Sequence, residues 1–260
     1  MGSMLEVQGL TKRFGGFTAV DRIGFDLAEG EILGLIGPNG SGKSTTFNLI
    51  AGALPPTAGS IKLDGREIAG RSPTEVCHLG IARTYQIPRP FRKLTILENV
   101  ALAAYFGANK QITRSEAWKR AEDALSLTQL PTDADVRVDG LGAAGLKKLE
   151  LARALATQPR LLLADESLGG LDEHEMDQAA DMLSDIRRER GITIIWVEHI
   201  MGVLMRVVDR CVVLDHGEII AAGLPRDVAH DPKVIEVYLG TDAESLQSQV
   251  NSRAAESGAC

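Results

Sequence analysis

The sequence predicts an α/β fold, in which helices cover both faces of a parallel sheet. Four short segments alternate with helical ones, and their apolarity is continuous, which is typical of strands buried on both faces. The chain has 260 residues, 44% of them hydrophobic, enough for one large core with a smaller subdomain attached. The four segments are EILGLIG (31–37), RLLLAD (160–165), ITIIWVEH (192–199) and RCVVLDHGEIIAAG (210–223).

Two further parts are expected around this core. LEVQGLTKRF (5–14), AVDRIGFDLAEG (19–30) and GSIKLDG (59–65) alternate apolar and polar residues, which indicates a flanking antiparallel sheet with one exposed face. Between residues 87 and 158, three helix-like segments follow one another with no strand between them, so we expect an inserted helical subdomain. These segments are TILENVALAAYF (95–106), RSEAWKRAEDALSLTQL (114–130) and LKKLELARALA (146–156).

We expect one domain over residues 4–240. Residues 4–86 and 159–228 would form the core with its antiparallel sheet, residues 87–158 the helical subdomain, and residues 229–240 a C-terminal extension. The remaining residues, 241–260, are polar and rich in small side chains, a composition typical of a disordered tail.

The composition excludes several classes of protein. A net charge of −7 argues against broad binding to a phosphate backbone, so nucleic acid is not an expected partner. The cysteines Cys77, Cys211 and Cys260 are far apart and lack C-x-x-C spacing, which indicates neither a disulfide framework nor a zinc site. The longest apolar runs are shorter than the roughly 18 residues that a membrane span requires.

The clearest motif is a phosphate-binding loop. Residues 37–44 read G-x-x-x-x-G-K-S, directly after a predicted buried strand and directly before a helix, which is the context this motif needs. Its glycines let backbone N–H groups surround a triphosphate, while Lys43 reaches the β and γ phosphates and the Ser44 hydroxyl binds Mg²⁺. The core is therefore predicted to be a P-loop NTPase of the RecA-like type that binds ATP. The expected nucleotide-binding residues are Gly37, Pro38, Asn39, Gly40, Ser41, Gly42, Lys43, Ser44 and Thr45.

Two carboxylates end the buried strand RLLLAD. Asp165, at the strand end, is expected to hold Mg²⁺ or its water, and Glu166, the next residue, to polarise the attacking water. A strand-terminal acid that merely faces solvent is common. A phosphate loop on the same chain needs such a partner, however, and this favours the functional interpretation.

By these motifs the chain resembles the ATP-binding subunits of ABC transporters, over nearly all of residues 5–240. RTYQIPRPF resembles the Q-loop of that family, IIWVEHI its switch segment and GGLDEHE its D-loop, all in the family's order. LTKRFGGFTAVD, GPNGSGKSTTFNLIAG and the ending DPKVIEVYLG are most similar to the branched-chain amino-acid uptake subfamily.

The resemblance implies four further site residues. Gln86 would coordinate Mg²⁺ or water and assist catalysis, His199 would contact the γ-phosphate, Asp172 would lie at the interface between two ATPase subunits, and Phe14 would stack on adenine. Three of them have a plainer alternative: a strand-end aromatic such as Phe14 is often part of a core, a lone Gln is usually solvated, and a lone His is often structural.

One motif departs from the family pattern. In such ATPases, each ATP lies between one chain's phosphate loop and a partner's L-S-G-G-Q signature at the start of a helix. Counting back from LKKLELARAL, the signature should occupy residues 141–145, which read LGAAG. Gly142 removes a hydroxyl, Ala143 and Ala144 add methyl groups, and Gly145 removes an amide. A lost hydrogen bond to a charged phosphate costs about 1.5–3 kcal/mol.

The predicted function is an ATP-hydrolysing subunit of an importer for branched-chain amino acids or related solutes. The resemblance implies a second ATPase subunit, two permeases and, indirectly, a solute-binding protein, at the cytoplasmic face of the membrane. The degenerate signature favours a heterodimer with one strong site, although a homodimer stays open. The alternatives are a weakly hydrolysing regulatory subunit, a lipopolysaccharide-export ATPase, and a non-transport ABC protein acting on ribosomes or DNA.

Overall fold

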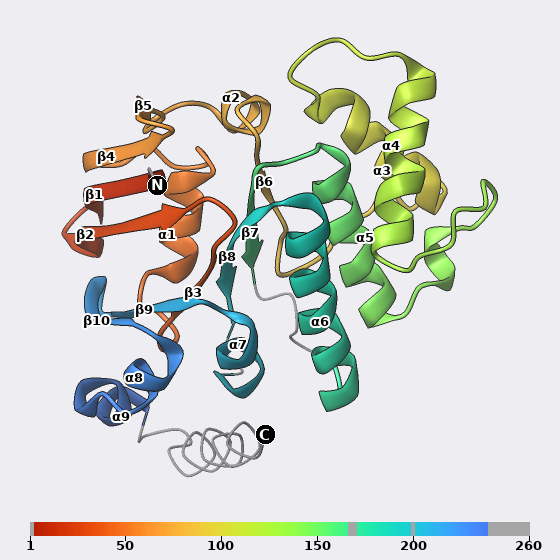
Figure 1. Ribbon diagram of the computed structural model, residues 1–260. Helices are drawn as coiled ribbons and strands as arrows, with labels where there is room; N and C mark the ends of the chain where they lie inside the picture. Colours follow the sequence, from red (N-terminus) through yellow and green to blue (C-terminus); the bar gives the residue numbers. More distant parts are fainter. Residues whose placement is uncertain (1–2, 166–170, 199–200, 239–260) are drawn as a thin grey trace.

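A six-stranded sheet forms the centre of the molecule in the computed structural model, which describes residues 3–165, 171–198 and 201–238 (Figure 1). Its strand order is β10-β9-β3-β8-β7-β6, and every pair is parallel except β9 with β10. The strands are β3 (Ile32–Ile36), β6 (Ile81–Arg83), β7 (Leu161–Asp165), β8 (Thr193–Val197), β9 (Arg210–Asp215) and β10 (Glu218–Gly223).

The continuous apolar segments are buried strands, as predicted. Every residue of β3, β7 and β8 is buried, because helices cover both faces of the sheet. On one face, α7 (Met201–Val207) packs so tightly against β3 that a Cβ added to Gly34 would lie 2.7 Å from a methyl carbon of Leu204.

A second, antiparallel sheet lies beside the first and has the strand order β2-β1-β4-β5. Helix α1 (Lys43–Ile50) packs between the two sheets, and its Phe47, Leu49 and Ile50 join one core cluster with residues of both (Figure 1). The alternating sequence segments are therefore half-buried strands, as expected. The strands are β1 (Ser3–Phe14), β2 (Phe17–Ala28), β4 (Ala58–Leu63) and β5 (Arg66–Glu67).

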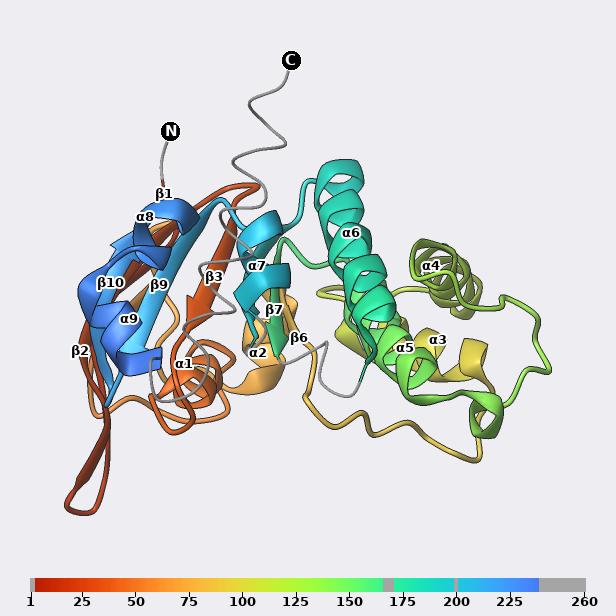
Figure 2. The same cartoon turned by 90° about the horizontal axis from the view of Figure 1, so that it is seen from below.

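Three helices form a separate group on the other side of the central sheet (Figure 2). Their contacting faces are rich in buried alanine, including Ala104, Ala121 and Ala152, whose small side chains let the helices approach closely. Residues 87–158 are all described and contain no strand beyond an isolated bridge between Thr95 and Arg137. The helices are α3 (Ile96–Gly107), α4 (Arg114–Leu127) and α5 (Ala143–Ala156).

The central sheet differs from the sequence prediction at two places. β6 has only three residues and was not predicted, yet it forms one edge of the central sheet. The segment 210–223 is not one strand but the hairpin β9–β10, which turns at His216, where φ is +46°, and Gly217, so the parallel sheet has one antiparallel edge.

The remaining helices connect these layers. No helix within the described ranges combines the length and apolarity that a membrane crossing requires. The connecting helices are α2 (Pro73–His78), η1 (Val138–Gly140), α6 (Glu173–Arg190), α8 (Pro225–Ala229) and α9 (Pro232–Tyr238).

Candidate nucleotide-binding site

The phosphate loop joins β3 to α1 and is held in a shape that only glycine permits at two positions. Gly37 has a φ of +147°, and a Cβ added there would lie 2.1 Å from the Leu214 carbonyl oxygen on β9. Gly42 has a φ of +107°, and its added Cβ would lie 2.7 Å from the Ala19 carbonyl oxygen on β2. Both sheets therefore press against the loop and fix its curvature.

Two side chains point their polar atoms into this loop. Lys43 is only 4% exposed, and its Nζ donates hydrogen bonds to the carbonyl oxygens of Gly37 (2.7 Å) and Pro38 (2.9 Å). The Ser41 hydroxyl oxygen is buried and has no hydrogen-bond partner in the described part of the chain. A buried cation beside an unsatisfied hydroxyl and a helix N-terminus is an arrangement suited to an anion.

The other expected loop residues lie on the accessible side. Asn39, Gly40 and Ser44 are exposed, while Pro38 and Thr45 are half-buried. Ser44 lies in the first turn of α1, so its hydroxyl is at the helix end that faces the loop.

The C-terminal extension also reaches the phosphate loop. The Tyr238 hydroxyl, at the end of α9, accepts a hydrogen bond from the Gly37 N–H, and burial raises the pKa of Tyr238 to about 12. The β9–β10 turn gives a second support, because the Gly217 N–H donates to the Ser41 carbonyl oxygen over 3.0 Å.

Asp165 ends β7 and is 5% exposed. Arg83 Nη2 donates to its Oδ2 over 2.6 Å, and Arg83 Nη1 donates to Asn48 Oδ1 on α1 over 2.5 Å. One guanidinium thus places the carboxylate beside the helix that begins in the phosphate loop. The Asp165 N–H donates to the Thr84 hydroxyl over 3.1 Å, which fixes the strand end.

Arg83 and Asn48 are site residues that the sequence analysis missed. Arg83 ends a strand that was not predicted, and only the pairing of β6 with β7 brings it next to Asp165. A signal was present all the same, since Arg83 lies three residues before Gln86, inside the segment taken for the Q-loop.

Gln86 and Phe14 are both exposed. Gln86 is the third residue after the end of β6 and is exposed, as is its neighbour Tyr85. Phe14 ends β1, is 47% exposed and lies 5.2 Å from Lys12 Nζ, measured to the ring centre. Phe14 is therefore not a core residue, and its ring is available to a ligand.

Residues 141–145, which the sequence analysis interprets as a degenerate signature, lie at the start of α5. Gly142 is the N-cap residue, with an extended backbone and no side-chain hydrogen bond to the helix. Gly142 and Ala143 are exposed, and Ala144 and Gly145 are half-buried. The first turn of α5 thus has no side-chain acceptor for its N–H groups at the cap position.

Asp172 has a structural role in the chain itself. It is the N-cap of α6 and forms a capping box, in which the Glu175 N–H donates to Asp172 Oδ1 (2.8 Å) and the Asp172 N–H donates to Glu175 Oε2 (3.1 Å). Glu166 and His199 lie outside the described residues, as does the predicted tail 241–260.

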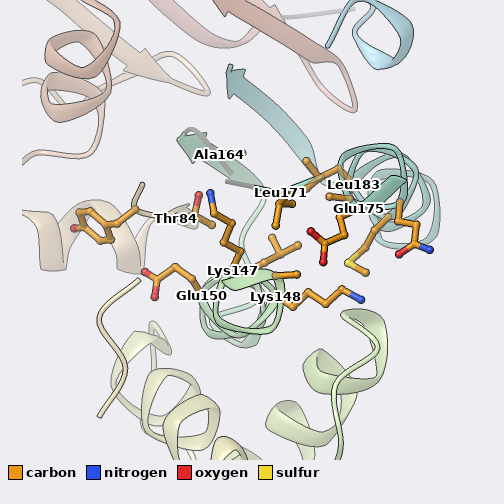
Figure 3. A pocket seen from close by; sticks show the side chains of 14 residues that line it. Thr84, Lys147, Lys148, Glu150, Ala164, Leu171, Glu175 and Leu183 are labelled. Atoms are coloured by element: carbon orange, nitrogen blue, oxygen red, sulfur yellow. The ribbon is translucent and has the colours of Figure 1, made fainter. Parts of the chain in front are cut away.

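A cavity separates α5 from α6 and the end of β7, with about 140 Å³ of space for water (Figure 3). Lys147, Lys148 and Glu150 border it from α5, and Leu183 borders it from α6. Burial raises the pKa of the Glu150 carboxyl, although Arg153 Nη1 donates to it over 2.8 Å. About half of the lining side chains are apolar, including Leu151, Ala164, Leu171, Ala179 and Met182.

Comparison with known proteins places this site in a family. A sequence model described as ABC transporter matches residues 20–169, and one described as branched-chain amino acid ATP-binding cassette transporter matches residues 218–244. The high-affinity branched-chain amino acid transport ATP-binding protein LivG of Salmonella typhimurium is 34% identical over 249 residues, which are 91% of this chain and 98% of LivG.

Solved structures agree. An ATP-binding cassette of an ABC transporter in its ADP conformation superposes with a TM-score of 0.84 at 29% identity, over 92% of this chain and 100% of that one. A dimeric bacterial ABC transporter cassette superposes with a TM-score of 0.77 at 28% identity, over 86% of this chain and 99% of that one.

The chain therefore belongs to the ABC transporter family, and within it to the cassettes of the branched-chain amino acid type. Its α/β fold is the P-loop NTPase fold of these cassettes, and it is an ATPase that serves transport. Such ATPase subunits dimerise and work with membrane permeases.

Proposed function

We propose that this chain binds Mg-ATP in its phosphate loop and hydrolyses it to power uptake of branched-chain amino acids or related small polar or aromatic solutes. The observation that supports this best is the loop itself, in which Gly37 and Gly42 enclose the buried Lys43 amine and the unsatisfied Ser41 hydroxyl. The solute class follows from the names of relatives such as LivG.

The donor set fits magnesium. Ser44 offers a hydroxyl, Gln86 an amide oxygen and Asp165 a carboxylate, and hard cations prefer such oxygen ligands. The contact of Arg83 with both Asn48 and Asp165 supports this assignment, because it brings the carboxylate beside the phosphate helix. When bound, Mg²⁺ would neutralise charge on the phosphates.

The remaining site residues complete this proposal. Phe14 offers an exposed ring on which adenine can stack. Lys43 contacts the β and γ phosphates, Glu166 polarises the attacking water, and His199 contacts the γ-phosphate. Residues 4–240 act as a single cassette with the subdivision predicted above.

The partner is a second ATPase subunit, and we propose a heterodimer. Gly142 gives α5 no hydroxyl, so a partner's ATP is gripped weakly there, whereas ATP in this chain's own phosphate loop meets the partner's signature. Asp172 lies at this interface. Two permeases bind the cassettes at the cytoplasmic face of the membrane, and a solute-binding protein delivers the substrate to them.

ATP binding and turnover test the proposal directly. The purified chain should bind Mg-ATP, lose that binding in Lys43→Ala and turn over slowly alone. Adding a partner cassette with an intact L-S-G-G-Q should raise turnover by about tenfold or more, as expected for one regained phosphate contact. Brisk turnover of the chain alone that is lost in Lys43→Ala and unaffected by Gly142→Ser would contradict the heterodimer.

A regulatory subunit is the second candidate, and the uncapped start of α5 favours it for a homodimer, because both composite sites would then contain the weak signature. Such a subunit would bind ATP but scarcely hydrolyse it. Glu166→Gln in the assembled transporter separates the two functions, because it should abolish turnover at this chain's site in an ATPase and leave turnover unchanged in a regulatory subunit.

A further inference from the structure

The end of β7 carries a buried ion pair between Arg83 and Asp165, and Arg83 has no part in the hydrolysis proposed above. Arg83 and Asp165 side chains are only 10% and 6% exposed, and their contact of 2.6 Å uses the Oδ2 oxygen of the carboxylate. This is the carboxylate proposed above as a magnesium ligand. A buried arginine therefore already holds one of its two oxygens.

The guanidinium is fixed by more than this bond. Its centre lies 5.7 Å from the ring centre of Phe47 on α1 and 5.1 Å from that of Tyr85, the neighbour of Gln86. Its Nη1 donates to Asn48 Oδ1 on α1. Its Nε is buried and has no hydrogen-bond partner in the ranges that the structure describes. Arg83 thus joins the phosphate helix, the strand end and the entrance of the Q-loop segment.

We propose that Arg83 is a positioning residue that holds Asp165 against the phosphate helix and keeps the carboxylate from binding a divalent cation until nucleotide is present. The inference rests on the proposed role of Asp165 as a magnesium ligand. It adds an order of events, in which the cation enters together with ATP.

The physical reason is competition for one oxygen. For Asp165 to coordinate a cation through Oδ2, Arg83 must release or share that atom. In addition, its positive charge repels any cation placed near it, strongly so because both side chains are buried. Nucleotide phosphates supply the negative charge that outweighs this repulsion. Without them, the carboxylate and the guanidinium neutralise each other.

Mn²⁺, a paramagnetic substitute for Mg²⁺, tests the inference by EPR titration of the purified full-length chain. The variant Arg83→Met removes the charge and keeps much of the side-chain length between the two rings. Without nucleotide, this variant should bind Mn²⁺ about tenfold or more tightly than wild type, since the repulsion is gone. Arg83→Lys keeps the charge and should stay within about threefold of wild type.

Arg160 provides a matched control, because it lies next to the start of β7, at the opposite end of that strand from Asp165. Arg160 precedes β7 and pairs with Asp64 and Glu29 on the surface, so Arg160→Met should leave Mn²⁺ affinity unchanged. If Arg83→Met fails to fold, Arg83→Gln carries the same expectation and can still bond Asn48. The double variant Arg83→Met/Asp165→Asn should lose the gain.

The measurements distinguish failure of the proposed role of Arg83 from failure of the proposed metal role of Asp165. Nucleotide-free Mn²⁺ affinity in Arg83→Met that is equal to or weaker than wild type would overturn the role of Arg83. If Asp165→Asn does not weaken Mn²⁺ binding in the presence of ADP, the proposed metal role of Asp165 fails instead. Thermal stability gives an independent readout, because Mn²⁺ alone should raise the Tm of Arg83→Met more than that of wild type.

Discussion

The starts of α1 and α5 are both glycine-rich helix N-termini, but glycine has a different meaning in each. At α1, Gly37 and Gly42 have positive φ angles, and an added Cβ would strike backbone oxygens at 2.1 and 2.7 Å. At α5, Gly142 has an ordinary extended backbone, and an added Cβ would meet nothing within 4 Å. Glycine is thus required by the fold in the phosphate loop and is replaceable at the signature position.

The largest expected effect comes from breaking the required geometry. Gly37→Ala should destabilise the fold by roughly 3–5 kcal/mol and abolish ATP binding, because the methyl group collides with the Leu214 carbonyl in a strained conformation. Gly40→Ala is the control, since Gly40 also has a positive φ but nothing near its added Cβ, and it should cost about 1 kcal/mol. Urea unfolding and ATP titration measure both. Equal costs would show that the contact with β9 does not matter.

The next-largest expected effect is a gain in both helix stability and ATP turnover. Gly142→Ser adds a hydroxyl at an N-cap position that has room for it, so α5 should be stabilised by a few tenths of a kcal/mol. With a partner cassette present, turnover of the partner's ATP should rise about tenfold. The measurement is single-turnover hydrolysis with this chain inactivated by Lys43→Ala. Gly142→Ala, which lacks the hydroxyl, should show no gain in turnover.

A third helix start shows what a side-chain cap contributes. Asp172→Ala removes the capping box of α6 and should lower the free energy of unfolding by about 1 kcal/mol. Asp172→Asn keeps an acceptor at the cap and should cost less. The urea midpoint of each variant checks this. If alanine and asparagine cost the same, the cap hydrogen bond is not what stabilises α6.

The smallest effect concerns the turn that supports the phosphate loop. A hydrogen bond from His216 to Asp215 raises the pKa of His216, so the folded state holds this proton more tightly than the unfolded state. The ion pair between His216 and Asp215 therefore stabilises the folded state fully below about pH 6.5, the ordinary histidine pKa. This stabilisation is lost as the pH rises through the raised pKa of His216. His216→Asn should therefore lower the Tm slightly at low pH and leave it unchanged at about pH 9. A Tm difference that stays constant with pH would contradict this assignment.

The buried strands could be predicted because their apolarity is continuous and local. β3, β7 and β8 lie where the sequence places them, whereas β6 has only three residues and ends in Arg83, which gives no apolar run to recognise. The hairpin β9–β10 was missed for a different reason, since the sequence 210–223 is apolar on both sides of its turn.

The site was predictable in part for the same reason. The phosphate loop is one contiguous segment with a distinctive spacing, so its residues and its position between strand and helix could be inferred. The Arg83–Asp165 pair depends on the lateral order of strands 82 residues apart in the chain, and no local pattern encodes that order. Glu166 and His199 stay predictions.

The cavity between α5 and α6 has a thermodynamic consequence. By area its walls are mostly apolar, and water against those parts finds few hydrogen-bond partners, although Lys147, Lys148 and Glu150 also border the space. Any movement of α5 that closes the space releases this water and buries apolar surface, which carries a negative heat-capacity change. Calorimetry of nucleotide binding over a range of temperatures would therefore register the motion of the helices as a slope in the binding enthalpy.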